Sequence, residues 1–280
     1  MNGETSKVAI QGIRGSYHAI AANQFFGDGS VELIDCVTFR DVVEAVKMLP
    51  DVAGVIAIEN TIAGSLLKNH ELIRESGLTV VGEYRLRISH CLAVLPGVLL
   101  TQIEEVNSHP MALMQCESFL ETMPQVRIVE RDDTATSARL INQNQLKNHA
   151  AICGKEAAKI YGLDILAEGI ESNKHNFTRF LIVMPHTLAQ KYKREKNKSS
   201  IVFSLHNSVG SLSQILMVFS FYGMNLTKIQ SFPMIGSEWE YLFYADLTFA
   251  DYVRYQRALD AVLPLVGDLK ILGEYEERTT

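Results

Sequence analysis

Five short polar segments of this chain carry the side chains that could do chemistry, and each interrupts a pattern of apolar strands and helices. They are residues 12–18 (GIRGSYH), 58–64 (IENTIAG), 107–116 (NSHPMALMQC), 132–135 (DDTA) and 173–180 (NKHNFTRF). Their polar groups are mainly hydroxyls, amides and arginine, with few strong bases. Held in a cleft, neutral donors of this kind can bind a polar substrate and stabilise a leaving group.

Taken one at a time, the segments also match ordinary turns and helix caps. Ser16 and Thr134 suit helix N-caps, and Asn60 suits a turn. His109 suits a general base or a metal ligand. It directly precedes a predicted helix, however, and has no second ligand at metal spacing, so we interpret it as a cap or core residue.

Signatures of other chemistries are missing from the sequence. It holds no G-x-S-x-G elbow, no H-E-x-x-H and no G-x-x-x-x-G-K-[ST] loop. The glycines of residues 12–16 lack the third glycine of a dinucleotide fingerprint. We therefore expect a site that uses neither a metal nor a cofactor.

Alternating strands and helices over roughly the first 185 residues must position these segments. Strands are predicted at 7–12, 53–58, 79–87, 91–95, 105–108, 127–131, 149–153, 165–170 and 180–184. Helices are predicted at 16–26, 39–49 after an N-cap at Thr38, 110–122, 135–142 and 155–161. This alternation indicates open α/β sheets, in which loops at the strand ends carry the chemistry.

A polar, basic run at 186–199 reads as a solvated linker to a unit of another kind. Beyond it, strands are predicted at 200–205, 225–232, 238–249 and 269–275, with helices at 210–222 and 252–265 and a turn at 234–237. The order strand-helix-strand-strand-helix-strand is the ferredoxin-like pattern, which hosts many functions.

Composition narrows the functional classes. The 280 residues are 47% hydrophobic and 21% charged, which is typical of a folded protein. The net charge of −6 disfavours binding to nucleic acid or to an anionic membrane, and no apolar run is long enough to cross a bilayer. The four cysteines form no C-x-x-C pair, and the start shows no secretory signal, so we expect free thiols and a cytoplasmic protein.

Together, the five segments resemble the prephenate dehydratase family in order and spacing. GIRGSYH corresponds to the family's G-P-x-G-T-F-S, IENT to I-E-N-S and SHPMALMQC to S-H-P-x-A-x-x-Q-C; DDTA follows, and TRF at 178–180 is the family's signature. The match spans most of residues 7–185. Residues 200–280 resemble an ACT domain, in which LTKIQSFP and WEYLF correspond to the family's L-T-K-I-E-S-R-P and W-E-Y-x-F.

The resemblance implies an α/β fold of two lobes, like a periplasmic binding protein, with the active site between them. It places the catalytic domain at 1–185, with a second lobe at about 88–165, a linker at 186–199 and a ferredoxin-like ACT domain at 200–280.

The implied reaction converts prephenate to phenylpyruvate, with loss of carbon dioxide and hydroxide. Because the ring becomes aromatic, the enzyme needs no nucleophile, metal or redox cofactor. The resemblance assigns Thr178 as the donor to the leaving hydroxyl, while Asn60, Ser108 and Gln115 orient the ring and bind carboxylate oxygens.

Three further residues are expected to bind substrate. Ser16 keeps a hydroxyl where the family has threonine, although the family's proline is absent, and Thr134 belongs to the DDTA segment. Arg179 either clamps a carboxylate or braces the hinge by pairing with Glu59, and the sequence leaves both possibilities open.

The resemblance also implies inhibition by L-phenylalanine bound between ACT domains, and a homodimer or homotetramer. The effector would contact Asn207, Gly210, Leu212, Gln230 and Ser231. Glutamate and arginine of the family's E-S-R-P are Gln230 and Phe232 here, which alters the polar groups offered to an amino acid. Three aromatic residues alternate along one strand and serve either an interface or the core: Trp239, Tyr241 and Phe243.

Two other functions remain open. Arogenate dehydratase uses the same motifs on a substrate with an amino group in place of the keto group. A non-catalytic sensor of a small acid could use the same two-lobed scaffold, although a pure binder has no need of the TRF threonine.

Overall fold

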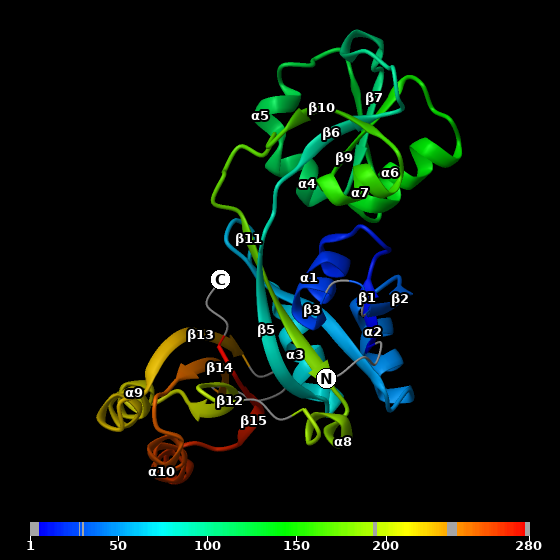
Figure 1. Cartoon of the computed structure of the whole chain (residues 1–280). Coiled ribbons are helices and arrows are strands. Elements are labelled where there is room, and N and C mark those ends of the chain that lie inside the picture. The colour runs from blue at the N-terminus through cyan, green and yellow to red at the C-terminus, as the bar shows by residue number, and fades with distance from the viewer. Residues whose placement is uncertain (1–5, 28, 30, 193–194, 234–239, 278–280) are drawn as a thin grey trace. The chain divides into compact units, whose positions relative to one another are not determined.

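The computed structural model describes residues 6–27, 29, 31–192, 195–233 and 240–277 (Figure 1). The chain divides into two compact units, Met1–Asn69 with Tyr84–Phe180, and His70–Glu83 with Leu181–Thr280. The domain boundaries expected from the sequence stay a prediction, since the second unit also takes in the segment His70–Glu83.

The first sheet has the strand order β2-β1-β3-β11-β5. Its strands are β2 (Val31–Cys36), β1 (Ser6–Gln11), β3 (Val52–Asn60), β11 (Phe177–Met184) and β5 (Thr79–Arg87), and the two-residue β4 (Gly64–Ser65) pairs with β3. Strand β1 pairs in parallel with both β2 and β3. Strand β3 is buried along nearly its whole length, which is typical of a central strand covered on both faces.

Local hydrogen bonds set where the helices of this region begin. Ser16 Oγ accepts the Ala19 N–H at 3.2 Å at the start of α1 (Tyr17–Phe26). Thr38 forms a capping box with Asp41 at the start of α2 (Phe39–Met48), so the predicted N-cap is confirmed. Helix α3 (Leu67–Ser76) follows β4.

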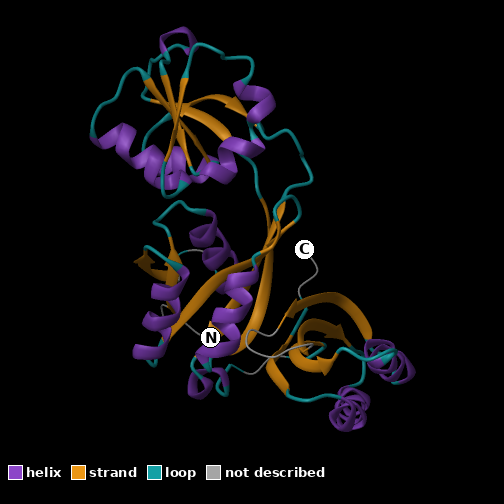
Figure 2. Cartoon of the chain, turned by 180° about the vertical axis from the view of Figure 1, so that it is seen from behind, coloured by secondary structure: helices purple, strands orange, loops and turns teal. Residues whose placement is uncertain are grey.

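The second sheet has the order β10-β6-β9-β7-β8, and helices flank its strands (Figure 2). Its strands are β10 (Asp164–Glu168), β6 (Cys91–Val94), β9 (His149–Cys153), β7 (Glu105–Ser108) and β8 (Arg127–Glu130). Its α-helices are α4 (Pro110–Gln115), α5 (Glu117–Leu120), α6 (Thr134–Gln143) and α7 (Lys155–Ile160), and the 3₁₀ helix η1 spans Leu100–Gln102. Two sheets in one chain, each with its own helices, confirm the two-lobed α/β class.

Two details of this lobe differ from the prediction. The single helix predicted at 110–122 is two helices, because the chain leaves helical geometry at Cys116 (φ −105°, ψ 14°). The N-cap of α6 is Asp133 and not Thr134, since the Asp133 carboxylate accepts the N–H groups of Ala135 and Thr136 at 2.7 and 3.0 Å.

The C-terminal sheet has the order β13-β14-β12-β15 with antiparallel pairing. Its strands are β12 (Lys198–His206), β13 (Asn225–Pro233), β14 (Glu240–Thr248) and β15 (Leu269–Tyr275); α9 (Ser211–Phe221), α10 (Tyr252–Val262) and the 3₁₀ helix η2 (Leu263–Leu265) complete it. The ferredoxin-like order is confirmed. The predicted linker holds helix α8 (His186–Ala189) and the start of β12, while Trp239 and the predicted turn at 234–237 lie outside the described residues.

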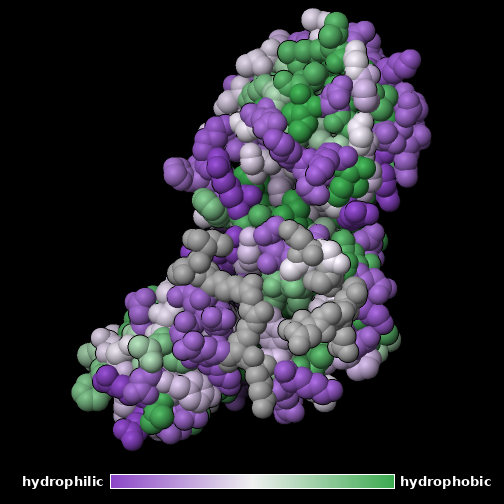
Figure 3. Space-filling view, viewed as in Figure 1, coloured by the Kyte–Doolittle hydropathy of each residue, from purple (hydrophilic) through white to green (hydrophobic). Residues whose placement is uncertain are grey.

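The molecular face in Figure 3 mixes hydrophilic side chains with smaller groups of apolar ones. Large apolar side chains such as Val209, Phe221 and Met48 are exposed, which is ordinary on protein surfaces. Among the described helices, none has the length and apolar character needed to cross a membrane.

Candidate active site

A cavity of about 270 Å³ in the first unit is lined by residues of both sheets and their helices. The lining residues come from the end of β1, the start of α1, the end of β3, helix α4, the start of α6 and strand β11. The residues are Gln11, Ser16, Tyr17, His18, Phe39, Ala57, Asn60, Ala63, Leu66, Ile88, His90, His109, Met111, Ala112, Gln115, Asp132, Asp133, Thr134, Thr178 and Phe180. All five segments singled out from the sequence contribute to it.

Three of the four residues expected to be catalytic line this cavity: Asn60, Gln115 and Thr178. Ser108 does not. Its hydroxyl is fully buried and donates a 2.6 Å hydrogen bond to the carbonyl of Ile152, on the neighbouring strand β9. In this structure Ser108 therefore braces two strands of the second sheet.

Asn60 connects the loop after β3 to the start of β11. Its Oδ1 accepts the N–H groups of Ile62 and Ala63, both at 2.9 Å. Its Nδ2 donates to Asn176 Oδ1 at 2.8 Å and to Thr178 Oγ1 at 3.0 Å. The amide is held at both ends, so it fixes the Thr178 hydroxyl oxygen in place.

The Thr178 hydroxyl is left with a proton to donate. Its oxygen already accepts from Asn60, and among the described residues the structure gives no acceptor for its proton. A hydroxyl that accepts one hydrogen bond becomes a better donor of another, because hydrogen bonds in a chain polarise each other. Since Thr178 lines the cavity, a bound molecule is the natural acceptor.

The residues expected to bind substrate separate into two groups. Ser16 and Thr134 line the cavity, at the N-terminal ends of α1 and α6. Arg179 is not among the lining residues: its side chain is 6% exposed, and Nη1 lies 3.8 Å from Glu59 Oε2. This geometry matches pairing with Glu59 rather than a carboxylate clamp.

Sequence reasoning did not single out three polar residues at this site. Tyr17 and His90 line the cavity, and Asn176 is fully buried beneath it. Asn176 and Tyr17 stand inside segments 173–180 and 12–18, so a signal for them existed. His90 lies just before β6, outside all five segments, and nothing in the sequence marked it.

Three histidines line the cavity, and burial lowers the pKa of each. For His109, the carboxylates of Asp133, Glu130 and Asp132 oppose this shift. His109 Nδ1 accepts the Met111 N–H at 3.2 Å, so it caps α4 as expected. Among the described residues no group of three or more His, Cys, Asp or Glu is arranged to hold a metal ion.

His18 should make the protein sensitive to acid. Burial lowers its pKa from the usual 6.5 to about 3, and within the described part of the chain its buried Nε2 has no hydrogen-bond partner. The folded protein binds a proton at His18 less readily than the unfolded chain does, so protonation of His18 favours unfolding. The stability of the fold is therefore unaffected by His18 above pH 6.5 and decreases as the pH falls from there toward 3. We expect a loss of about 1–2 kcal/mol in unfolding free energy between pH 7.5 and 5.0.

Urea unfolding at both pH values measures this loss. In the parent, the ring centroids of His18 and Phe180 lie 4.9 Å apart. The variant His18→Phe keeps an aromatic ring at this position but cannot titrate, so its unfolding free energy should change less with pH. An equal change in the variant and the parent would assign the acid sensitivity to other groups.

The residues expected to bind an effector lie in the loop between β12 and α9, in the first turn of α9 and on β13. Gly210 precedes α9 with φ of 85°, a left-handed conformation that favours glycine, and Asn207 and Leu212 flank it. Gln230 and Ser231 lie on β13, at one edge of the sheet. Phe232 packs edge-on against Tyr244, with their ring centroids 5.3 Å apart, so its aromatic ring has a packing partner within its own sheet.

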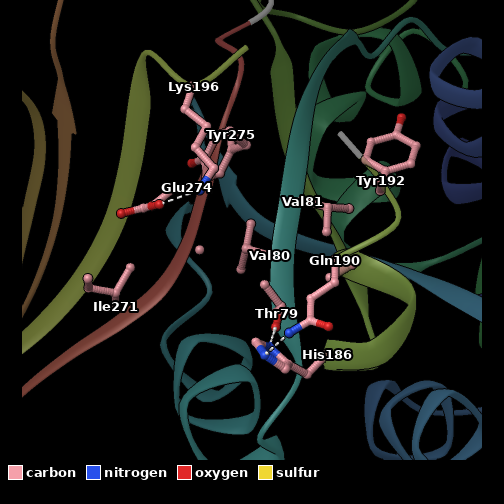
Figure 4. Close-up of a pocket in the computed structure, with 12 residues that line it drawn as sticks. Thr79, Val80, Val81, His186, Gln190, Tyr192, Lys196, Ile271, Glu274 and Tyr275 are labelled. Carbon is pink, nitrogen blue, oxygen red and sulfur yellow. Dashed lines mark hydrogen bonds and ion pairs between the residues drawn. The ribbon is translucent and has the colours of Figure 1, made fainter. Parts of the chain in front are cut away.

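A larger cavity of about 620 Å³ lies in the second unit, between β15, β5 and helix α8 (Figure 4). The Lys196–Glu274 ion pair at 2.6 Å borders it on one side, and His186, Thr79 and Gln190 form a hydrogen-bonded group on the other. None of the residues predicted to bind substrate or effector lines it.

The fold and the cavity define a two-lobed α/β protein whose cavity presents hydroxyl, amide and imidazole groups together with two aspartates. A model of the family described as prephenate dehydratase matches residues 8–187, and the chain belongs to this family. It is therefore an enzyme of the lyase class.

Known proteins are similar to this chain in sequence and in structure over nearly its whole length. Arogenate dehydratase/prephenate dehydratase 2 of Arabidopsis thaliana is 37% identical over 290 residues, covering 100% of this chain and 75% of that protein. A prephenate dehydratase from Arthrobacter aurescens, solved in complex with L-phenylalanine, has a TM-score of 0.83 and 27% identity over 97% of this chain and 90% of that chain. A structure described as a novel type of quorum-quenching acylase has the same TM-score and identity, over 97% and 98%.

Proposed function

We propose that this chain converts prephenate to phenylpyruvate, with Thr178 as the donor to the departing hydroxyl. The observation that carries this assignment is the Thr178 hydroxyl, which accepts a hydrogen bond from Asn60 and lines the cavity, so that its proton remains available to a bound molecule. As the carbon–carbon bond to the ring carboxylate breaks, its electron pair enters the ring and the carbon–oxygen bond to the hydroxyl breaks. The Thr178 hydrogen bond stabilises the departing hydroxide, which takes up one proton from solvent, so the products are phenylpyruvate, carbon dioxide and water.

Backbone groups supply part of the binding of the substrate carboxylates. The first N–H groups of α1, at Tyr17 and His18, have no intrahelical acceptor and lie where the cavity meets the helix. A helix N-terminus favours a negative charge through these donors and through its dipole. Gln115 adds an amide to the same cavity.

One feature of the lining favours arogenate as a second substrate. The lining residues include two aspartates, Asp132 and Asp133, and none of the residues described around the cavity is lysine or arginine. Such a lining suits a substrate with an ammonium group better than it suits a dianion. The name of the Arabidopsis relative includes both activities.

The assay that tests the function supplies each substrate in parallel. Phenylpyruvate is measured by its absorbance in alkali, and phenylalanine formed from arogenate by chromatography. We expect activity with at least one substrate, undiminished in EDTA and without added nucleotide. Loss of activity in EDTA that a divalent ion restores would contradict the mechanism, and a protein inactive on both substrates would contradict the function.

We further propose that L-phenylalanine inhibits the enzyme by binding at the C-terminal sheet, which we assign as an ACT domain. Support comes from the Arthrobacter relative solved with L-phenylalanine and from the left-handed Gly210 turn, which lets a ligand approach the backbone closely. End-product binding would favour a conformation with a less competent site.

Calorimetry with L-phenylalanine tests this regulation. We expect Gly210→Ala to weaken binding by about tenfold, because a side chain strains this turn and narrows the approach. Gly223→Ala is the matched control, since it has a similar φ of 79° at the other end of α9. No binding heat from the parent, with unchanged turnover at millimolar phenylalanine, would leave the domain with an assembly role only.

Assembly and location complete the proposal. We propose a homodimer or homotetramer formed partly through residues 200–280, where β13 is an edge strand of the sheet and edge strands readily pair. We also propose a cytoplasmic location, supported by four cysteines that are all free thiols; the Arabidopsis relative is described as chloroplastic.

A further inference from the structure

A continuous chain of hydrogen bonds runs along the wall of the cavity and ends at Thr178. It runs from the Tyr17 hydroxyl to the His90 ring, then through the amides of Gln115, Asn176 and Asn60. The successive distances from Tyr17 to Asn60 are 2.9, 2.9, 2.9 and 2.8 Å. His90 is 2% exposed and Asn176 is fully buried, so water does not compete for these bonds.

The direction of the chain is determined from its Asn60 end. Two backbone N–H groups donate to Asn60 Oδ1, so the other end of this amide is the donor, and Asn176 Oδ1 receives it. Asn176 Nδ2 must then donate to Gln115 Oε1. Backbone donors cannot reverse, so each amide beyond Asn60 has only one orientation that satisfies its neighbours.

The same argument fixes the tautomer of His90. Gln115 Oε1 is an acceptor, so His90 Nε2 carries a proton and donates to it. His90 Nδ1 then carries no proton and lies 2.9 Å from the Tyr17 hydroxyl, whose single proton is shared between Nδ1 and the Ser89 carbonyl at 2.8 Å. Burial lowers the His90 pKa and favours this neutral ring, although the bond to Gln115 and the nearby Glu171 carboxylate oppose the shift.

We propose that His90 and Asn176 are positioning residues that orient Gln115 and Asn60 and, through Asn60, the hydroxyl of Thr178. His90 Nε2–H holds the Gln115 oxygen toward Asn176 and leaves the Gln115 amino group to the cavity. Asn176 holds Asn60, which holds the Thr178 oxygen. The kinetic consequence depends on the proposed function, whereas the tautomer and the direction of the chain do not.

Two variants of His90 separate positioning from simple support. In His90→Gln the side-chain amino group replaces Nε2 and still reaches Gln115. In His90→Asn the shorter amide replaces Nδ1 and reaches only Tyr17. We expect His90→Gln to keep kcat within about threefold of the parent, and His90→Asn to lower kcat by about tenfold or more with KM changed less than threefold, because misplacing a catalytic donor affects the transition state most.

Asn176→Asp provides an independent test, because it keeps the acceptor for Asn60 but removes the donor to Gln115. We expect it, too, to lower kcat by about tenfold or more. Equal kcat in His90→Gln and His90→Asn, or full kcat in Asn176→Asp, would overturn the proposal. Thermal unfolding of each variant establishes that it is folded before its kinetics are compared.

Nitrogen-15 NMR of the histidine-labelled full chain reads the tautomer without any turnover. We expect the His90 signals of a neutral ring protonated at Nε2 at pH 7.5. A ring protonated at Nδ1 would overturn the proposal even in an active enzyme. The Nε2–H form in a protein inactive on both substrates would instead show that the proposed function has failed while the chain of hydrogen bonds stands.

Discussion

Replacing Thr178 with alanine is expected to lower kcat by about 10²-fold or more while the protein stays folded. The hydroxyl is held by Asn60 at 3.0 Å and lines the cavity, so the variant removes one preorganised donor. Removing one such donor from an enzyme site costs roughly 3–4 kcal/mol of transition-state stabilisation. Steady-state kinetics on the preferred substrate, with unfolding curves for both proteins, measure the effect.

Thr178→Ser is the matched control, because it keeps the hydroxyl and loses only a methyl group. It should keep kcat within about tenfold of the parent. Turnover in Thr178→Ala that equals the parent's would remove Thr178 from the mechanism. The donor would then have to be sought among the other cavity groups, of which Gln115 is the first candidate.

Replacing Lys198 with methionine is expected to give the largest loss of stability of any single change considered. Lys198 is fully buried at the start of β12, and its Nζ lies 2.7 Å from Glu83 and 2.9 Å from Glu277. The Glu83 side chain is also almost completely buried. Removing one partner of a buried pair leaves the other charge uncompensated, which costs about 3–5 kcal/mol.

Urea unfolding measures this cost, and two further variants test its cause. Lys196→Met breaks the Lys196–Glu274 pair, whose lysine is 46% exposed, and should cost less than about 1 kcal/mol. Adding Glu83→Gln to Lys198→Met should recover part of the loss, since it removes the stranded carboxylate. Equal costs for the two lysine variants would show that burial of the pair does not determine its contribution.

Features that depend on neighbouring residues were predictable from the sequence. Thr38 caps α2 and Ser16 caps α1 because a side-chain oxygen accepts a hydrogen bond from the N–H group three residues ahead, which a short motif encodes. Strand β2 was missed because it is an edge strand with exposed Glu32 and Asp35, so it lacks the apolar run of a central strand.

Features that depend on distant residues were not predictable. Ser108 and Gln115 belong to the same sequence motif, yet only Gln115 lines the cavity. The Ser108 hydroxyl instead donates to the carbonyl of Ile152, which lies 44 residues further along the chain. The role of His90 depends on its hydrogen bonds with Tyr17 and Gln115, which form only in the folded protein. The spacing of these residues along the sequence does not indicate those bonds. Sequence therefore predicted which segments form the site, but not which side chains hold it in place.

The separations along the hydrogen-bond chain have a consequence for the order in which the protein folds. Asn60 and Asn176 are 116 residues apart, and Tyr17 and His90 are 73 apart. Contacts of this range form only after large loops have closed, which is slow. During synthesis, Asn60 therefore remains without its distant partners, Asn176 and Thr178, until residues 173–180 have emerged from the ribosome. The first lobe's sheet gains its strand β11 in the same step, so the reactive centre and the final strand of that sheet should mature together.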